Sequence, residues 1–219
     1  MGADTETQSP RMLGADRAKA LADGVVAIAI TLLILPLMES VSEAAGQGQG
    51  AAEWLGDHDG QMITFVISFV IVALLWMNHH QLFSTVESVT PLVLWLLVAW
   101  MLTIVWMPVA TALTGQLPSS DPTAKALYIG SMILTTLVSL ATRVVLAKRP
   151  DVHRTDPEAV RIGISVDLAM ATLFTLSLVV ALVVPGVDYF ALFLMLLTSW
   201  LHRLYARLLG LPRPRPARG

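Results

Sequence analysis

The feature that most constrains the fold of this chain is the length of its apolar segments. A transmembrane helix needs about 20 mostly apolar residues, because each residue adds about 1.5 Å of rise. Six segments meet this length, at about 13–38, 61–83, 91–113, 124–147, 162–184 and 187–209. The sequence therefore predicts an all-α membrane protein with six transmembrane helices, in one domain.

The composition supports the same class and excludes several others. Hydrophobic residues make up 55% of the 219 residues and charged residues only 14%, whereas soluble domains contain about 25% charged residues. The chain has no cysteine, and it lacks the motifs of nucleophilic, metal-dependent or phosphate-binding catalysis. We expect no enzymatic activity, no metal, no cofactor and no nucleic-acid partner.

The positions of the basic residues predict the orientation, because cytoplasmic loops are enriched in Lys and Arg. Thirteen of the fourteen basic residues fall on one side of the six predicted segments, and only Lys125 falls on the other. The opposite side carries acidic residues such as Glu43, Asp57, Asp121 and Asp188. Both termini are therefore predicted to be cytoplasmic.

The connections differ in length and character. The four residues 185–188 separate the last two segments, so these segments should be antiparallel neighbours. The connection after the first segment is rich in Gly, Ala and acidic residues, which fits a short surface helix or partial disorder. Residues 210–219 alternate Pro and Arg, and we expect a disordered basic tail that contacts anionic lipid.

Several polar residues lie inside or at the ends of the apolar segments, where an ionised side chain is costly. Asp23 is six residues from Arg17, about 240° around a helix, so Asp23 needs a partner on another helix or subunit. Candidates at the same membrane end are Asn78, His79 and His80. Asp167 lies on the fifth segment, and we favour a structural ion pair with an arginine over a role in proton transfer.

The first apolar segment has two stripes that share Thr31, one along its outer half and one along its inner half. With 100° per residue, Ile28, Thr31, Leu32 and Leu35 lie within one narrow sector of a helix. Gly24, Ala27 and Thr31 form a seam of small residues, which lets helices approach closely in lipid. Periodicity alone is also compatible with an ordinary bundle helix whose Ile and Leu side chains face lipid.

Two motifs resemble those of the transmembrane protein 175 family, the potassium channels of lysosomes and their prokaryotic relatives. The stretch "RAKALADGVVAIAITLLIL" is similar to the family's first-helix signature, in which Arg is followed after three residues by Phe-Ser-Asp. Arg17 and Asp23 match, whereas Leu21 and Ala22 replace the usual Phe and Ser. The stretch "WMNHHQLF" at 76–83 resembles the family's Trp-x-x-His-His-x-Leu-Phe element.

The resemblance implies a homotetramer in which the first helices of four copies line a central pore for K⁺. Its pore-lining residues would be Ile28, Thr31, Leu32 and Leu35, with Ile28 as the tightest apolar constriction and Thr31 as a ring of hydroxyls. A polar cluster would hold the pore helices in place, and its members would be Arg17, Asp23, Trp76, His79 and His80. Pro36 is expected to end the helix just beyond the pore-lining stripe.

Two other functions are compatible with the residues. A proton-coupled secondary transporter would use Asp23 and Asp167 as proton carriers, and a non-conducting scaffold would recruit a cytoplasmic partner through the basic tail. The resemblance favours passive K⁺ flow through a multi-pass protein of a prokaryotic cell membrane.

Overall fold

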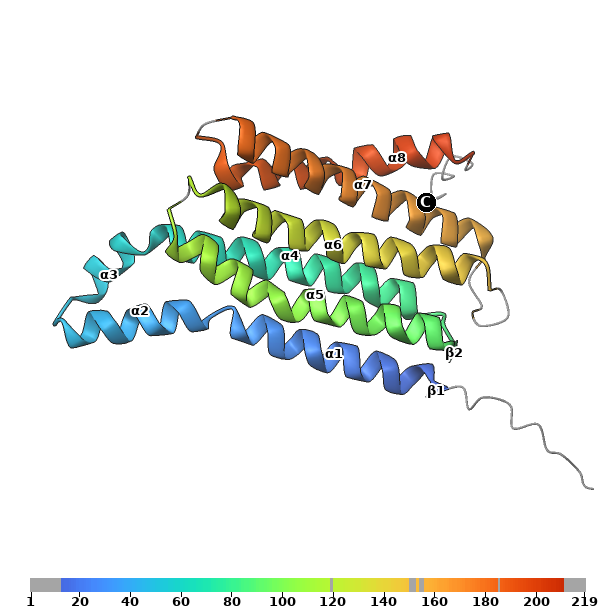
Figure 1. Ribbon diagram of the computed structural model, residues 1–219, viewed down its shortest axis with the longest axis horizontal. Helices are drawn as coiled ribbons and strands as arrows, with labels where there is room; N and C mark the ends of the chain where they lie inside the picture. Colours follow the sequence, from blue (N-terminus) through green and yellow to red (C-terminus); the bar gives the residue numbers. More distant parts are fainter. Residues whose placement is uncertain (1–12, 119, 150–152, 154–155, 185, 211–219) are drawn as a thin grey trace, which may run out of the picture.

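The computed structural model describes residues 13–118, 120–149, 153, 156–184 and 186–210 (Figure 1). The basic tail predicted at 210–219 lies outside these residues, apart from Gly210. The described chain is helical except for one short two-stranded antiparallel sheet. Its elements are β1 (Leu13–Gly14), α1 (Ala15–Leu32), α2 (Leu35–Gly46), α3 (Ala51–Asp57), α4 (Asp59–Phe83), β2 (Ser88–Val89), α5 (Pro91–Gln116), α6 (Pro122–Ala147), α7 (Pro157–Val183), the 3₁₀-helix η1 (Asp188–Leu197) and α8 (Thr198–Leu208).

Three of the long helices begin with the same pair of signals, a capping side chain followed by proline. Thr90, Asp121 and Asp156 cap α5, α6 and α7 by accepting hydrogen bonds from backbone N–H groups of the first turn. A proline follows each cap, where its missing N–H costs nothing and its fixed φ angle suits a helix. These starts are therefore encoded locally.

Within the described residues, five helical segments are long and apolar enough to cross a membrane, with α1 and α2 counted as one segment. Many of their large apolar side chains face outward, including Leu102 on α5 and Leu134 on α6. Such surfaces are stable in lipid and not in water. The chain is thus an integral membrane protein of several helices.

Helix α5 lies at the centre of the bundle and packs against α1, α4 and α6. Five of its large side chains recur every three or four residues and are at most 1% exposed; they are Val93, Leu97, Trp100, Ile104 and Met107. This spacing places them on one face of the helix. Helices α6 and α7 then pack side by side, and α7 contacts both η1 and α8.

The last predicted segment is not one continuous α-helix. It forms η1 and α8 instead, and neither is long enough to span a membrane alone. The Ser177 hydroxyl of α7 donates to the backbone carbonyl of Ala191 in η1, 2.8 Å away. Gly186 and Asp188 have φ angles of 82° and 41°, which reverse the chain. The predicted antiparallel neighbours are confirmed, and the sixth crossing stays a prediction.

The first predicted segment is also interrupted, between α1 and α2 at Leu33 and Ile34. Pro36 was expected to end the helix beyond Leu35, but the helix ends three residues before Leu35 and a second one begins there. Pro36 cannot donate to the carbonyl four residues earlier, and its ring crowds that carbonyl. The break therefore occurs in the turn that precedes the proline.

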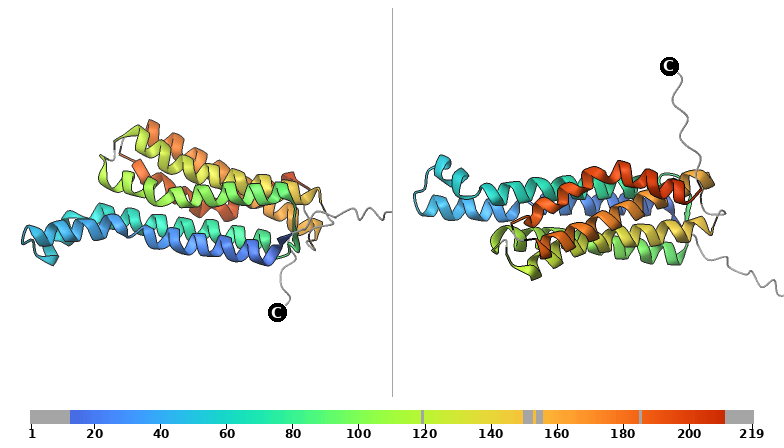
Figure 2. Two further views of the ribbon diagram at one scale, coloured as in Figure 1. Left: turned by 60° about the horizontal axis from the view of Figure 1, so that its bottom comes forward. Right: turned by 90° about the horizontal axis from the view of Figure 1, so that it is seen from above.

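Helices α2 and α3 project beyond the rest of the bundle (Figures 1 and 2). Of the two alternatives for the connection after the first segment, partial disorder or a short surface helix, the structure shows the helix, α3 at Ala51–Asp57. The opposite end of the bundle gathers the start of α1, the end of α4, the start of α7 and the end of α8 (Figure 1). Residues 13 and 210 thus lie at one end, and its assignment to the cytoplasm stays a prediction.

Candidate functional site

Helix α1 has one face packed inside the protein and one face that is open. The packed face consists of small or medium side chains that are at most 8% exposed, namely Ala15, Ala18, Ala22, Val26 and Ala29. Their small size allows close contact with α5 and α4, against which α1 packs. The chain's own bundle therefore covers only this side of the helix.

The four predicted pore-lining residues lie on the open face. Ile28 is 62% exposed, Leu32 37% and Leu35 46%, and Thr31 is exposed as well. The Thr31 hydroxyl donates its hydrogen to the Ile28 carbonyl at 2.8 Å. Its oxygen lone pairs can still accept a hydrogen bond. Leu35 belongs to α2, so the break at Leu33 and Ile34 separates it from the regular geometry of the other three.

The predicted seam of small residues is on the open side too. Gly24 and Ala27 are exposed, and a Cβ built on Gly24 would meet no other atom within 4 Å. No other element of the described residues therefore fills the space next to Gly24. The seam remains available for another copy of the helix.

Asp23 has its partner on α4, as the helix geometry requires. The Trp76 indole Nε1 donates to Asp23 Oδ1 over 2.8 Å. The Trp76 ring also lies against the His80 ring, with centroids 5.5 Å apart. These three residues of the predicted cluster are brought together, and they attach α1 to α4 near one end of the bundle.

The other two predicted members take different positions. His79 is 4% exposed and stacks on Trp100 of α5, with ring centroids 3.6 Å apart, and neither of its ring nitrogens has a hydrogen-bond partner within the described chain. His79 still borders a small cavity of about 20 Å³ together with Asp23 and His80, which is room for one water molecule. Arg17 is exposed, and no described contact joins it to Asp23.

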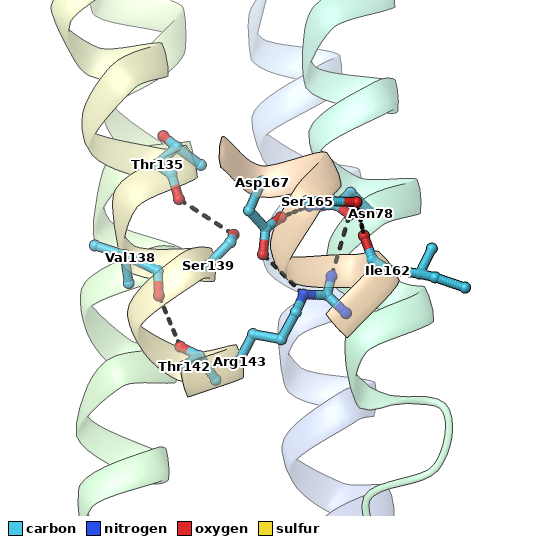
Figure 3. Close-up of polar contacts among 9 residues, drawn as sticks. All are labelled: Asn78, Thr135, Val138, Ser139, Thr142, Arg143, Ile162, Ser165 and Asp167. Atoms are coloured by element: carbon cyan, nitrogen blue, oxygen red, sulfur yellow. Dashed lines mark hydrogen bonds and ion pairs between the residues drawn. The ribbon is translucent and has the colours of Figure 1, made fainter. Parts of the chain in front are cut away.

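A second polar network lies deeper between α4, α6 and α7 (Figure 3). Arg143 Nε donates to Asp167 Oδ2 at 2.8 Å, and Asn78 Nδ2 donates to Asp167 Oδ1 at 2.7 Å. Arg143 Nη2 also donates to Asn78 Oδ1 at 3.2 Å, which closes the triangle. The arginine ion pair favoured for Asp167 is confirmed.

Sequence reasoning did not assign Asn78 to this network. The signal was its position two residues after Trp76, about 200° around the helix, so that the two residues face opposite neighbours. The end of α4 therefore contacts α1 through Trp76 and α6 and α7 through Asn78. Among the described residues, no group of three His, Asp or Glu side chains is placed to hold a metal ion.

The polar contacts at the other end of the bundle are structural. Lys125 on α6 is 6% exposed, and its Nζ lies 2.6 Å from Asp188 Oδ1 and donates to the Ala181 carbonyl at 3.0 Å. The one basic residue on the predicted outer side is therefore neutralised by an acidic residue of the same side. This pair joins the start of α6 to the turn between α7 and η1.

Comparison with known proteins adds a family match. Residues 17–108 match the family model described as endosomal/lysosomal potassium channel TMEM175. This range includes all but the first two residues of α1, the whole of α4 with Trp76, and most of α5.

Curated relatives agree with the family match. A potassium channel of Streptomyces collinus is 36% identical over 105 residues, covering 48% of this chain and 50% of that protein. A potassium channel of Chamaesiphon minutus is 25% identical over 162 residues, 68% of this chain and 77% of that protein. An endosomal/lysosomal proton channel TMEM175 of Gallus gallus is 34% identical over 109 residues, 48% of this chain and 22% of that protein. The chain thus spans about half the length of the Streptomyces relative.

Proposed function

Because residues 17–108 match the TMEM175 family model, we propose that this chain is a member of that family and a potassium-permeable cation channel of the prokaryotic cell membrane. Four copies assemble around a central axis, and their α1 helices line the pore. K⁺ flows passively down its electrochemical gradient. The protein carries ions and catalyses no covalent reaction.

The observation that carries the proposal is the open face of α1. Ile28, Thr31 and Leu32 lie on this face, while the opposite alanine-rich face packs against the protein's own helices. A pore helix must have this division, because one side anchors it and the other side faces ions. The exposed seam at Gly24 and Ala27 supports close approach between neighbouring copies.

The pore of this proposal selects ions without a ring of backbone carbonyls, since the chain has no TVGYG stretch. A ring of four Ile28 side chains forms an apolar constriction that limits conduction by dewetting. The four Thr31 hydroxyls replace part of the water around a passing cation and give a modest preference for K⁺ over Na⁺. Leu32 and Leu35 add further apolar layers.

The cluster of Asp23, Trp76 and His80 holds the pore helix in position. Its hydrogen bond attaches α1 to α4, so α1 cannot rotate freely about its axis. Rotation by one residue, about 100°, would replace Ile28 in the pore by a different side chain.

Six crossings complete the proposed topology, with both termini in the cytoplasm. The ten residues of η1 rise about 20 Å at the 3₁₀ spacing, and the eleven residues of α8 add about 16 Å. Together they exceed the bilayer core of about 30 Å. The end of the bundle that holds residues 13 and 210 is the end where predicted cytoplasmic Lys and Arg residues concentrate.

The direct test is ion flux through the purified protein in liposomes. We expect K⁺ flux above Na⁺ flux, with Ile28→Asn raising the flux severalfold and weakening the preference, because a polar side chain wets the constriction. Leu134→Asn is the matched control, since Leu134 is 53% exposed on α6 and lies outside the proposed pore. Unchanged flux and preference in Ile28→Asn would remove Ile28 from the pore.

The same liposomes separate the channel from its rivals. A scaffold gives no flux, and a transporter gives substrate uptake that requires a pH gradient. The transporter needs Asp167 to bind and release protons, whereas Asp167 is fully buried and bonded to Arg143 and Asn78. Because the Gallus gallus relative is described as a proton channel, H⁺ flux is measured beside K⁺ flux.

A further inference from the structure

A cavity of about 250 Å³ lies between the end of α4, the end of α6 and the start of α7. Asn78 and Ser84 border it from the α4 side, Arg143 from α6, and Ala159 and Gly163 from α7. It is separate from the open face of α1, so the proposed pore does not use it. Its size admits a phosphate group and several atoms attached to it.

Arg143 brings unused hydrogen-bond donors to this cavity. A guanidinium has five N–H groups, and Arg143 uses one on Asp167 and one on Asn78. The other three have no acceptor in the part of the chain that the structure describes. Figure 3 shows one terminal nitrogen directed away from both partners, and it lies against Gly163, where the absence of a Cβ leaves it room.

The charges around the cavity favour an anion. Asp167 is fully buried and accepts a hydrogen bond from Arg143. It does not border the cavity. Among the described residues that do border it, none is Asp or Glu. Ala159 and Val160 come from the first turn of α7, where the helix dipole is positive; the carboxylates of Asp156 and Glu158 at this helix start are exposed and do not border the cavity. Arg143 is thus the only permanent charge on the described wall.

We infer that this cavity binds a phosphate oxyanion through Arg143. Arginine is suited to this ligand because its planar donors can bind two phosphate oxygens at once. The cavity lies at the end of the bundle where Lys148, Arg149 and Arg161 are exposed. The phosphate is either the headgroup of an anionic phospholipid or a free phosphate, and the experiment distinguishes these two sources.

The test introduces a negative charge into the cavity without disturbing the buried network. Ala159 is exposed in the first turn of α7, where a glutamate does not weaken the helix. Ala159→Glu should repel phosphate, and Ala159→Gln is the matched control of almost equal size. A second variant, Arg143→Gln combined with Asp167→Asn, removes the guanidinium and its positive charge while keeping the buried pair neutral.

The measurements use the whole 219-residue chain in a phosphate-free detergent such as dodecyl maltoside, to which phosphatidylglycerol or inorganic phosphate is added. Native mass spectrometry counts bound phosphatidylglycerol, and thermal unfolding reports binding of inorganic phosphate. We expect wild type and Ala159→Gln to bind one of these two probes, and Ala159→Glu and the double variant to bind it about tenfold more weakly or worse. Retention of phosphatidylglycerol identifies a lipid headgroup, and a response to inorganic phosphate alone identifies a free ion.

Two results would overturn the inference. One is binding of neither probe by wild type, and the other is equal binding by the Glu and Gln variants. Because binding is measured without ion flux, its failure leaves the channel proposal intact, and failure of the channel leaves this site open to the same test.

Discussion

At the scale of single residues, Asp23 shows how a membrane helix accommodates a carboxylate. A short acidic side chain cannot reach water from within an apolar helix, so a donor has to come to it. Trp76 supplies that donor from α4 at 2.8 Å. Arg17, on the same helix, lies about 240° away and stays exposed. The partner is set by direction around the helix and not by distance along the sequence.

Trp76→Phe tests this bond. It keeps an aromatic ring beside His80 but removes the one hydrogen-bond donor to the Asp23 side chain found among the described residues. We expect a loss of about 1–3 kcal/mol of stability, seen as a lower midpoint of thermal unfolding in detergent. Trp95→Phe is the control, because Trp95 is 71% exposed. Equal midpoints for the two variants would show that the bond contributes no stability.

At the scale of helices, α6 and α7 are held together by an α6 side chain that fits only because the facing residue of α7 is a glycine. Arg143 of α6 lies directly against Gly163 of α7, where a Cβ would collide with the guanidinium. The buried ion pair with Asp167 depends on this position. Removing one partner of such a pair is costly, because the other charge stays buried.

Gly163→Ala should therefore destabilise the packing of α6 against α7, although alanine is the better helix former. We expect a cost of about 1–3 kcal/mol from overpacking, measured as a lower unfolding midpoint. Gly130→Ala is the matched control on α6, because no atom lies within 4 Å of the Cβ that it adds. It should leave the midpoint unchanged or raise it. Equal unfolding midpoints for Gly163→Ala and Gly130→Ala would show that Arg143 can move aside without a loss of stability.

At the scale of the whole molecule, the chain presents a surface that its own fold leaves uncovered. The open face of α1 combines large apolar side chains with the small residues Gly24 and Ala27. In lipid, the hydrophobic effect does not drive helices together, so they associate through close packing at small residues. This face is where the proposed tetramer forms.

Gly24→Leu tests the assembly. A bulky side chain at Gly24 should hold neighbouring α1 helices apart and convert a species of four chains into smaller ones. Mass photometry or native mass spectrometry of the purified protein reports this as a fall from four times the 23.7 kDa of the chain. Gly130→Leu, on α6, is the control. An intact assembly of four chains in Gly24→Leu would place the subunit contact elsewhere.

Some properties of this protein follow from the sequence alone. The apolar segments specify a helical membrane protein because lipid leaves no other partner for the backbone. Thr90, Asp121 and Asp156, each before a proline, mark where helices start. These signals are local, so no knowledge of the fold is needed to interpret them. The two motifs at 17–35 and 76–83 likewise indicated the family that residues 17–108 match.

Other properties depend on the tertiary structure. His79 and His80 are adjacent in sequence, but packing buries His79 against Trp100 and leaves His80 beside Trp76. The 3₁₀ helix η1 is held by a hydrogen bond from α7, a contact that its own sequence does not specify. Asn78 joined the Arg143 and Asp167 pair only when three helices met. A polar side chain in a membrane protein takes whichever partner the packed helices bring to it, and sequence spacing within one helix cannot specify that partner.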